Sequence, residues 1–187
     1  MAGNTSQRLY HLARQADNSR LLIAAACRMA DHAAACLIEG QIEPLPASLA
    51  VSQIVQGWLD DKARDAGHEA VAQVALPARR ISGNLEIPLS VWAHCLSCSH
   101  LARMLQEHID GPDDKLLAKR LGWIATEACN CVASQIAQGD TGSPSYSLAW
   151  DAEGEWQVEC LESILGLCEL APGGDRCRLR NSLLAGK

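Results

Sequence analysis

The sequence predicts a mostly α-helical fold: one domain built as a bundle of five or six helices, with a small C-terminal β-hairpin. Several long stretches repeat apolar residues at spacings of three and four, which is the period of a helix with one buried face. The chain has five Trp, two Tyr and no Phe, so Ala and Leu must fill most of the core, which favours closely packed helices. Its 187 residues suit one compact domain, predicted over 1–171, with a short tail over 172–187.

The clearest predicted helix covers 88–110. Pro88 fits its first turn, where a missing N–H costs nothing. One face of this helix is apolar and carries Val91, Cys95, Cys98, Ala102, Leu105 and Ile109. A second helix is predicted from Asp113, as its cap, to about Gln138, with Gly139 at its end. The short link between the two helices predicts antiparallel neighbours.

Three further helices are predicted in the N-terminal third. The first begins near Thr5 and ends at a polar joint over 17–19, and the second ends at Gly40. The third is predicted from Ser48, as its cap, to about residue 66. The stretch 21–38 is apolar enough to resemble a membrane span, but charged residues interrupt it, so we interpret it as a buried helix. His32 lies at the border of its apolar face and is interpreted as a satisfied or solvent-edge histidine.

The C-terminal hairpin is predicted over 146–160, because apolar residues alternate on both sides of a polar loop. In this register, Trp150 lies opposite Trp156 and Tyr146 lies opposite Cys160. A short helix would follow from about Leu161. The alternative is a helix from about 155 to 170.

One metal site is predicted on the two central helices, from a cluster of imidazole and thiol ligands suited to zinc: His94, Cys95, Cys98 and Cys131. His100 points to the opposite side of its helix and is left out of the cluster. The simpler interpretation, which the spacing favours, is that these cysteines are small buried apolar residues. No cofactor is therefore expected, and zinc is the alternative.

Charge and motifs narrow the classes of function. A net charge of −6 and a pI near 5.5 argue against direct nucleic-acid binding, which needs a basic face. The nine cysteines cannot all pair, and the N-terminus does not resemble a signal peptide, so we expect reduced thiols in the cytoplasm and no membrane association. The motifs of nucleotide-binding proteins, serine hydrolases and zinc proteases do not occur, so an enzyme is disfavoured.

These observations lead to one function hypothesis and two alternatives. The first is a non-enzymatic cytoplasmic regulator, adaptor or inhibitor that binds another macromolecule, with a protein as the expected partner. The second is a zinc- or thiol-based structural or sensor protein that uses the His94 and cysteine cluster. The third is a bundle that binds a small molecule near the irregular stretch 77–87 and Trp92. A homo-oligomer is compatible with all three.

Overall fold

The computed structural model describes residues 2–16, 18–60, 70, 72, 87–111 and 113–166. Six α-helices and no strand lie within these residues, which confirms the mostly helical prediction. The helices are α1 (Ala2–Gln15), α2 (Ser19–Glu39), α3 (Pro46–Leu59), α5 (Leu89–Asp110), α6 (Asp114–Ile136) and α7 (Pro144–Ile164). The predicted tail over 172–187 lies outside the described residues, so the predicted domain boundary is untested.

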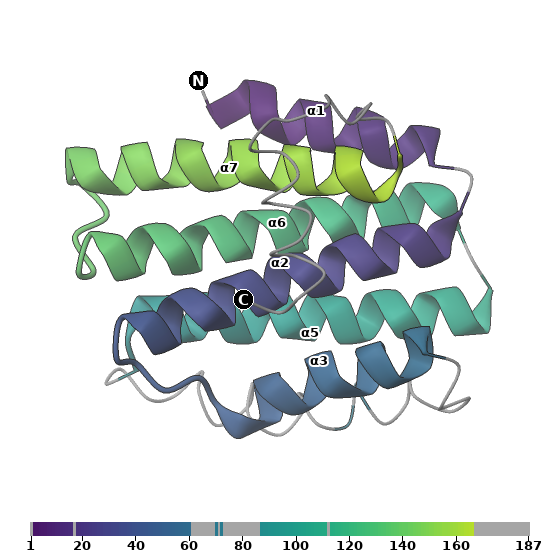
Figure 1. Cartoon of the computed structure of the whole chain (residues 1–187), viewed down its shortest axis with the longest axis horizontal. Helices are drawn as coiled ribbons and strands as arrows, with labels where there is room; N and C mark the ends of the chain where they lie inside the picture. Colours follow the sequence, from purple (N-terminus) through teal and green to yellow (C-terminus); the bar gives the residue numbers. More distant parts are fainter. Residues whose placement is uncertain are drawn as a thin grey trace, which may run out of the picture.

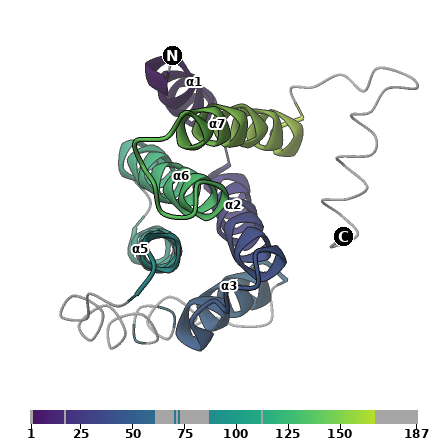
Figure 2. The same cartoon turned by 90° about the vertical axis from the view of Figure 1, so that its left-hand side faces the viewer.

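The helices form three layers of two (Figures 1 and 2). α1 and α7 make one outer layer, α6 and α2 the middle layer, and α5 and α3 the other outer layer. α2 and α6 are therefore covered on both sides.

α5 and α6 are antiparallel neighbours, as predicted. Glu107 near the end of α5 pairs with Arg120 near the start of α6, while Ser97 earlier in α5 donates to the carbonyl of Ile124 later in α6. Of the two helices, α6 belongs to the middle layer, and this layer, made of α2 and α6, supplies most of the core.

Local side chains explain where the helices begin. Asn18, within the predicted polar joint over 17–19, caps α2 by accepting from the N–H of Arg20. Asp113 caps α6, as the sequence predicted. Ser48 is not a cap, because α3 begins two residues earlier at Pro46, whose ring fits a first turn. Ser48 instead lies buried inside the helix.

α2 and α6 end in the same way. The first residue with positive φ is Gln41 after α2 and Gln138 after α6, and the next N–H in each case returns to a carbonyl five residues earlier. After α6 the following Gly139 also has positive φ, which glycine adopts without strain. Gly40 matters for packing and not for its own φ. A Cβ at Gly40 would overlap the end of the Gln135 side chain, so the Gln135 amide of α6 lies directly against this glycine.

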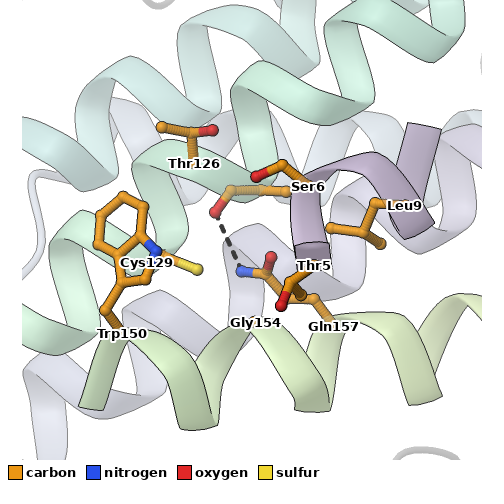
Figure 3. A pocket seen from close by; sticks show the side chains of 9 residues that line it. Thr5, Ser6, Leu9, Thr126, Cys129, Trp150, Gly154 and Gln157 are labelled. Atoms are coloured by element: carbon orange, nitrogen blue, oxygen red, sulfur yellow. Dashed lines mark hydrogen bonds between the residues drawn. The ribbon is translucent and has the colours of Figure 1, made fainter. Parts of the chain in front are cut away.

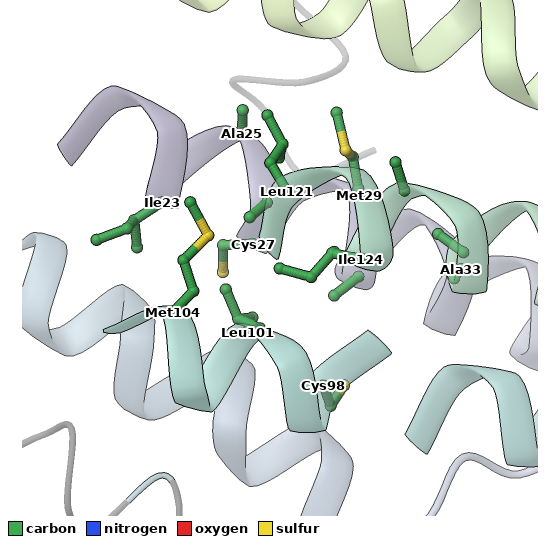
Figure 4. Packing of buried hydrophobic residues seen from close by; sticks show 14 of the residues in the cluster. Ile23, Ala25, Cys27, Met29, Ala33, Cys98, Leu101, Met104, Leu121 and Ile124 are labelled. Carbon is green, nitrogen blue, oxygen red and sulfur yellow. The ribbon is translucent and has the colours of Figure 1, made fainter. Parts of the chain in front are cut away.

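The core is made of aliphatic side chains, two methionines and several thiols between α2, α5 and α6 (Figure 4). Alanines on α2 let this helix lie close to its neighbours: Ala25, Ala26, Ala30 and Ala33 are all buried. In Figure 4, Met29 and Met104 lie in the same cluster as Leu101, Leu121 and Ile124. Ala and Leu thus fill most of the interior, as the composition predicted.

The predicted hairpin is wrong, because residues 146–160 belong to α7. Ser143 caps this helix by accepting from the N–H of Tyr146, and Pro144 fits its first turn. The buried face does have helical spacing, but small and polar residues occupy much of it: Ala149, Glu153, Gly154, Gln157, Val158, Cys160 and Leu161. Leu148, which alternation would place on the same strand face as Tyr146 and Trp150, is 71% exposed. The polar residues on the buried face concealed the helical period.

α2 is long and apolar enough to cross a membrane, by length and composition alone. Its most apolar window has a mean hydropathy of 1.6, and 56% of that window is buried against the other helices. α2 lies in the middle layer and packs on α3, α5, α6 and α7. This packing is what a core helix requires, and the expectation that the protein does not enter a membrane stays a prediction.

Candidate functional site

The predicted metal ligands lie in the core, where only two of them contact each other. Nε2 of His94 lies 3.5 Å from Sγ of Cys98, one turn further along α5. Sγ of Cys95 lies 3.1 Å from the hydroxyl of Ser48 on α3. Sγ of Cys131 donates to the carbonyl of Ala33 on α2 at 3.6 Å. Each of the last two thiols therefore has a partner away from His94.

No group of three His, Cys, Asp or Glu side chains with metal-binding geometry occurs among the described residues. The zinc prediction is therefore untested and receives no support from the geometry. The exclusion of His100 is sound, because this ring lies beside Arg120 and Trp123 on the outer side of α5 and α6. Cys129, which the sequence placed off the apolar face, is buried against α7.

Burial keeps the core groups uncharged. It raises the pKa of Cys98 well above its ordinary value, and neighbouring thiols and Asp31 add to the shift. Burial also lowers the pKa of His94 to about 4, so this imidazole is neutral at pH 7. Its Nδ1 makes no hydrogen bond to any described residue. The backbone of Ala30 on α2 opposes this lowering of the pKa without outweighing it.

A second histidine site joins α2 to α7, and sequence reasoning missed it. Nδ1 of His32 lies 3.1 to 3.2 Å from the carboxylate oxygens of Glu153. The Glu153 side chain is only 2% exposed, whereas the His32 side chain is 34% exposed. A buried carboxylate is costly unless it is paired, so the His32 ring is the charge partner that makes Glu153 tolerable in α7.

Two α7 side chains hold this pair in position. Nε2 of Gln157 donates to Glu153 at 3.1 Å and to the Ala125 carbonyl at 3.1 Å. The Trp156 ring stacks on the His32 ring, with centroids 3.9 Å apart and an angle of 24° between the planes. The imidazole is thus fixed in its plane by stacking and in its direction by the carboxylate.

The other ring nitrogen of His32 faces a thiol. Sγ of Cys36, one turn further along α2 and half-buried, lies 4.0 Å from Nε2. Glu153 and Cys36 therefore use opposite nitrogens of one ring and cannot share a metal ion with it. Burial lowers the pKa of His32, but Cys36 and Glu153 outweigh burial and raise the pKa to about 10. This ring carries a proton at pH 7.

Part of this site could have been found in the sequence. His32 and Cys36 are four residues apart, so on a helix they share one face. Glu153 could not have been found, because 121 residues separate it from His32 and it lies in the stretch predicted as a hairpin. Only the packing of α7 on α2 brings the three groups together.

One shallow hollow opens between α1, α6 and α7 (Figure 3). It measures about 280 Å³ including open solvent, and its enclosed part holds about one water molecule. Its walls include Thr5, Cys129, Trp150, Gly154 and Gln157. The hollow is too small for an organic ligand. The stretch 77–87 was predicted to bind a small molecule, and its residues 77–86 lie outside the described residues. The small-molecule alternative is therefore untested.

No family model, curated protein or solved structure matches the chain. The function must therefore be argued from the sites themselves.

Proposed function

We propose that this protein is a non-enzymatic interaction protein that binds a protein partner through one end of the helical bundle. The observation that carries the proposal is the distribution of exposed aliphatic side chains. Four of them lie near the same end and are between 43% and 71% exposed: Ile38, Leu89, Ile136 and Leu148. Exposed apolar side chains that gather in one place are typical of binding surfaces, whereas scattered ones are not.

The helix arrangement places these four residues at the same end of the bundle, which we call the apolar end. Ile38 is one residue before the end of α2, and Ile136 is the last residue of α6. The close approach of Gly40 to Gln135 joins these two helix ends. α7 begins a short loop after α6, and α5, being antiparallel to α6, begins at this same end (Figure 1). Leu89 is the first residue of α5, and Leu148 is the fifth residue of α7.

The proposal is tested with a double variant, Ile38→Asp with Ile136→Asp, used as bait in extracts of the source cells. Each isoleucine buried by a partner contributes about 1.5 to 3 kcal/mol, so two aspartates should reduce partner recovery at least about tenfold. The matched control is Ile109→Asp, because Ile109 is 39% exposed at the opposite end of α5. Thermal melts of all three proteins check folding.

The expected result is a partner retained by the wild type and by Ile109→Asp and lost with the double variant. Sedimentation of the same proteins shows whether the partner is a second copy of this chain. Equal recovery of every protein by all three baits would refute binding through the apolar end.

The second proposal remains a zinc- or thiol-based protein that uses His94, Cys95, Cys98 and Cys131. One observation favours it: a neutral, buried imidazole lies beside a buried thiol, and its Nδ1 has no hydrogen-bond partner among the described residues. Zinc binding needs a neutral imidazole and deprotonated thiols. The test is the zinc content of protein purified without a polyhistidine tag, with His94→Leu as the variant. A metal-free wild type would refute the zinc site and leave only the thiol-based alternative.

A further inference from the structure

We propose that the partner bound at the apolar end is a basic protein segment, in which Lys or Arg side chains flank apolar ones. This inference rests on the proposed function, because it names the chemistry of the partner for that same surface. The exposed aliphatic side chains indicate only that the partner is apolar at its centre. The charges and the aromatic rings around them indicate what the rest of the partner carries.

Carboxylates surround the apolar end. Glu39 follows Ile38 at the end of α2, Glu43 lies in the next loop, and Asp140 lies in the loop between α6 and α7. All three of these acidic residues are exposed. Neither Glu39 nor Glu43 forms an ion pair with another described residue. A partner can therefore reach these carboxylates without first breaking a contact between described residues.

Within the part of the chain that the structure describes, basic side chains lie away from this end. α3 and α7 contain no Lys or Arg. On the three other helices that begin or end beside the four aliphatic residues, the nearest basic residues are Arg28 of α2, Arg103 of α5 and Arg120 of α6. Arg28 lies about 15 Å before Ile38 along the helix, and the other two lie farther from the ends of theirs.

Two further cations lie nearer the middle of the bundle and are already paired. Arg8 of α1 lies 2.9 Å from the carboxylate of Glu155 on α7. The charged His32 ring lies 3.1 Å from the buried Glu153 carboxylate. The exposed carboxylates of the apolar end thus give it a negative potential that none of these cations neutralises.

The tryptophans give a second, independent indication of a basic partner. Outside the apolar end, Trp rings are covered by cations of the chain itself. The guanidinium of Arg20 lies 5.0 Å from the centroid of the Trp58 ring. Lys119 and Arg120 each place their charge 4.8 Å from the centroid of the Trp123 ring. Such contacts stabilise a cation over an aromatic face.

Two tryptophans at the apolar end lack this partner. Trp92 lies in the first turn of α5 and Trp150 in the second turn of α7, and both are half-buried. Among the described residues, no Lys or Arg lies over either ring. The Trp150 ring lies beside that of Tyr146, with centroids 6.1 Å apart. Lys or Arg side chains of a partner would find both carboxylates and aromatic rings here.

A basic segment explains these features better than a second copy of the chain does. In a two-fold pairing of apolar ends, Glu39 and Glu43 of one copy would face the same acidic region of the other. Like charges that face each other across an interface oppose association. Anionic membranes and nucleic acids would be repelled for the same reason. A basic segment can contact the aliphatic side chains, the carboxylates and the rings together.

The experiment uses two synthetic amphipathic helices as probes for the full chain. Both peptides have the same leucines on one face, and the other face carries lysines in one peptide and glutamates in the other. Fluorescence anisotropy measures the Kd of each peptide at low salt. The lysine peptide should bind at least about tenfold more tightly, and about 500 mM salt should remove most of this difference. Equal binding of the two peptides, or binding of neither, overturns the proposal.

Two pairs of substitutions remove the same charge from different places. Glu39→Gln with Glu43→Gln should weaken binding of the lysine peptide about fivefold or more, because its cations lose their counter-charges. Asp110→Asn with Glu159→Gln is the matched control, since both residues are exposed and lie at the end of α5 and in the second half of α7. The control should bind like the wild type. Equal weakening by both pairs would overturn the assignment to the apolar end.

A neutral variant separates this inference from the proposed function. Ile38→Ser with Ile136→Ser removes apolar surface and leaves the charge unchanged, and it should also weaken binding of the lysine peptide. Weakening by the serine pair but not by the glutamine pair would keep the apolar end as a binding surface and overturn the basic partner. Full binding by the serine pair would refute the apolar end and this inference with it.

Two further measurements test the other occupants of the apolar end. Sedimentation of the wild type should show no dimer that the serine pair dissociates, because such a dimer would identify a second copy as the occupant. Vesicles of phosphatidylserine and phosphatidylcholine should not retain the wild type. Retention that the serine pair abolishes would identify a lipid surface and overturn the basic protein partner. Thermal melts of every variant check folding.

Discussion

His32 and His94 lie on apolar faces of two neighbouring helices, yet the fold gives them opposite charge states. His94 is 1% exposed and lies beside the Cys98 thiol, so burial lowers its pKa to about 4. Burial lowers the pKa of His32 too, but its contacts with Cys36 and with the buried Glu153 carboxylate outweigh burial and raise this pKa to about 10. The comparison teaches that a histidine on an apolar stripe becomes a core residue or a charged group according to the helix that packs on it.

The largest effect is expected at His94 in acid. The pKa of His94 is lowered from 6.5 to about 4, so the free energy of unfolding is unaffected by this group above pH 6.5. As the pH falls from 6.5 toward 4, the free energy of unfolding decreases, because the unfolded chain binds the proton more tightly than the folded chain. The full loss is about 3 kcal/mol. His94→Leu should abolish this loss, as measured by urea unfolding at pH 7 and pH 4.5. His11→Leu, on the exposed face of α1, is the control and should keep it.

A smaller effect should distinguish the thiols beside the two histidines. Cys98 is fully buried, so Cys98→Ser places a hydroxyl in an apolar core and should cost about 2 kcal/mol. Cys36 is half-buried at the edge of α2, so Cys36→Ser should cost less than about 0.5 kcal/mol. Urea unfolding at pH 7 measures both. Similar losses of unfolding free energy in the two variants would mean that the two thiols occupy equivalent environments. That result would contradict the difference drawn between the two histidine sites.

The smallest effect is the alkaline counterpart at His32. A folded-state pKa raised above 6.5 contributes stability that is complete below pH 6.5 and is lost as pH rises through about 10. Because a third of the ring is exposed, solvent screens the pair and the contribution should stay below about 1 kcal/mol. The difference in stability between wild type and His32→Gln should therefore be larger at pH 6 than at pH 10. A difference that grows toward pH 10 would contradict the charge state assigned here.

The helices that could be predicted are those with a clear apolar stripe or a capping side chain. α5 and α6 both have the stripe, and α6 also has the Asp113 cap, whereas Pro88 marks the start of α5 without capping it. The antiparallel packing of the two helices followed from the short link between them. α7 could not be predicted in this way, because Glu153 and Gln157 occupy its buried face. A period of apolar residues is a reliable signal only where apolar residues fill the buried face.

The predicted site shows the same limit. Helical spacing correctly placed Cys95 and Cys98 on the buried face of α5 and His100 away from them. Spacing could not show that Cys95 contacts Ser48 and that Cys131 contacts the Ala33 carbonyl, since both partners lie on other helices. Which side chains meet depends on interhelical packing, and the zinc prediction depended on it throughout.

The sequence by itself determined the helical class, the alanine-rich core and the caps at Asn18 and Asp113, because these depend on residues within a few positions of one another. It also placed His32 and Cys36 on one helical face. Only the tertiary structure decided that His32 is charged and His94 is neutral. The pKa of a buried group depends on distant neighbours, and Glu153 reaches His32 across 121 residues only when α7 packs on α2.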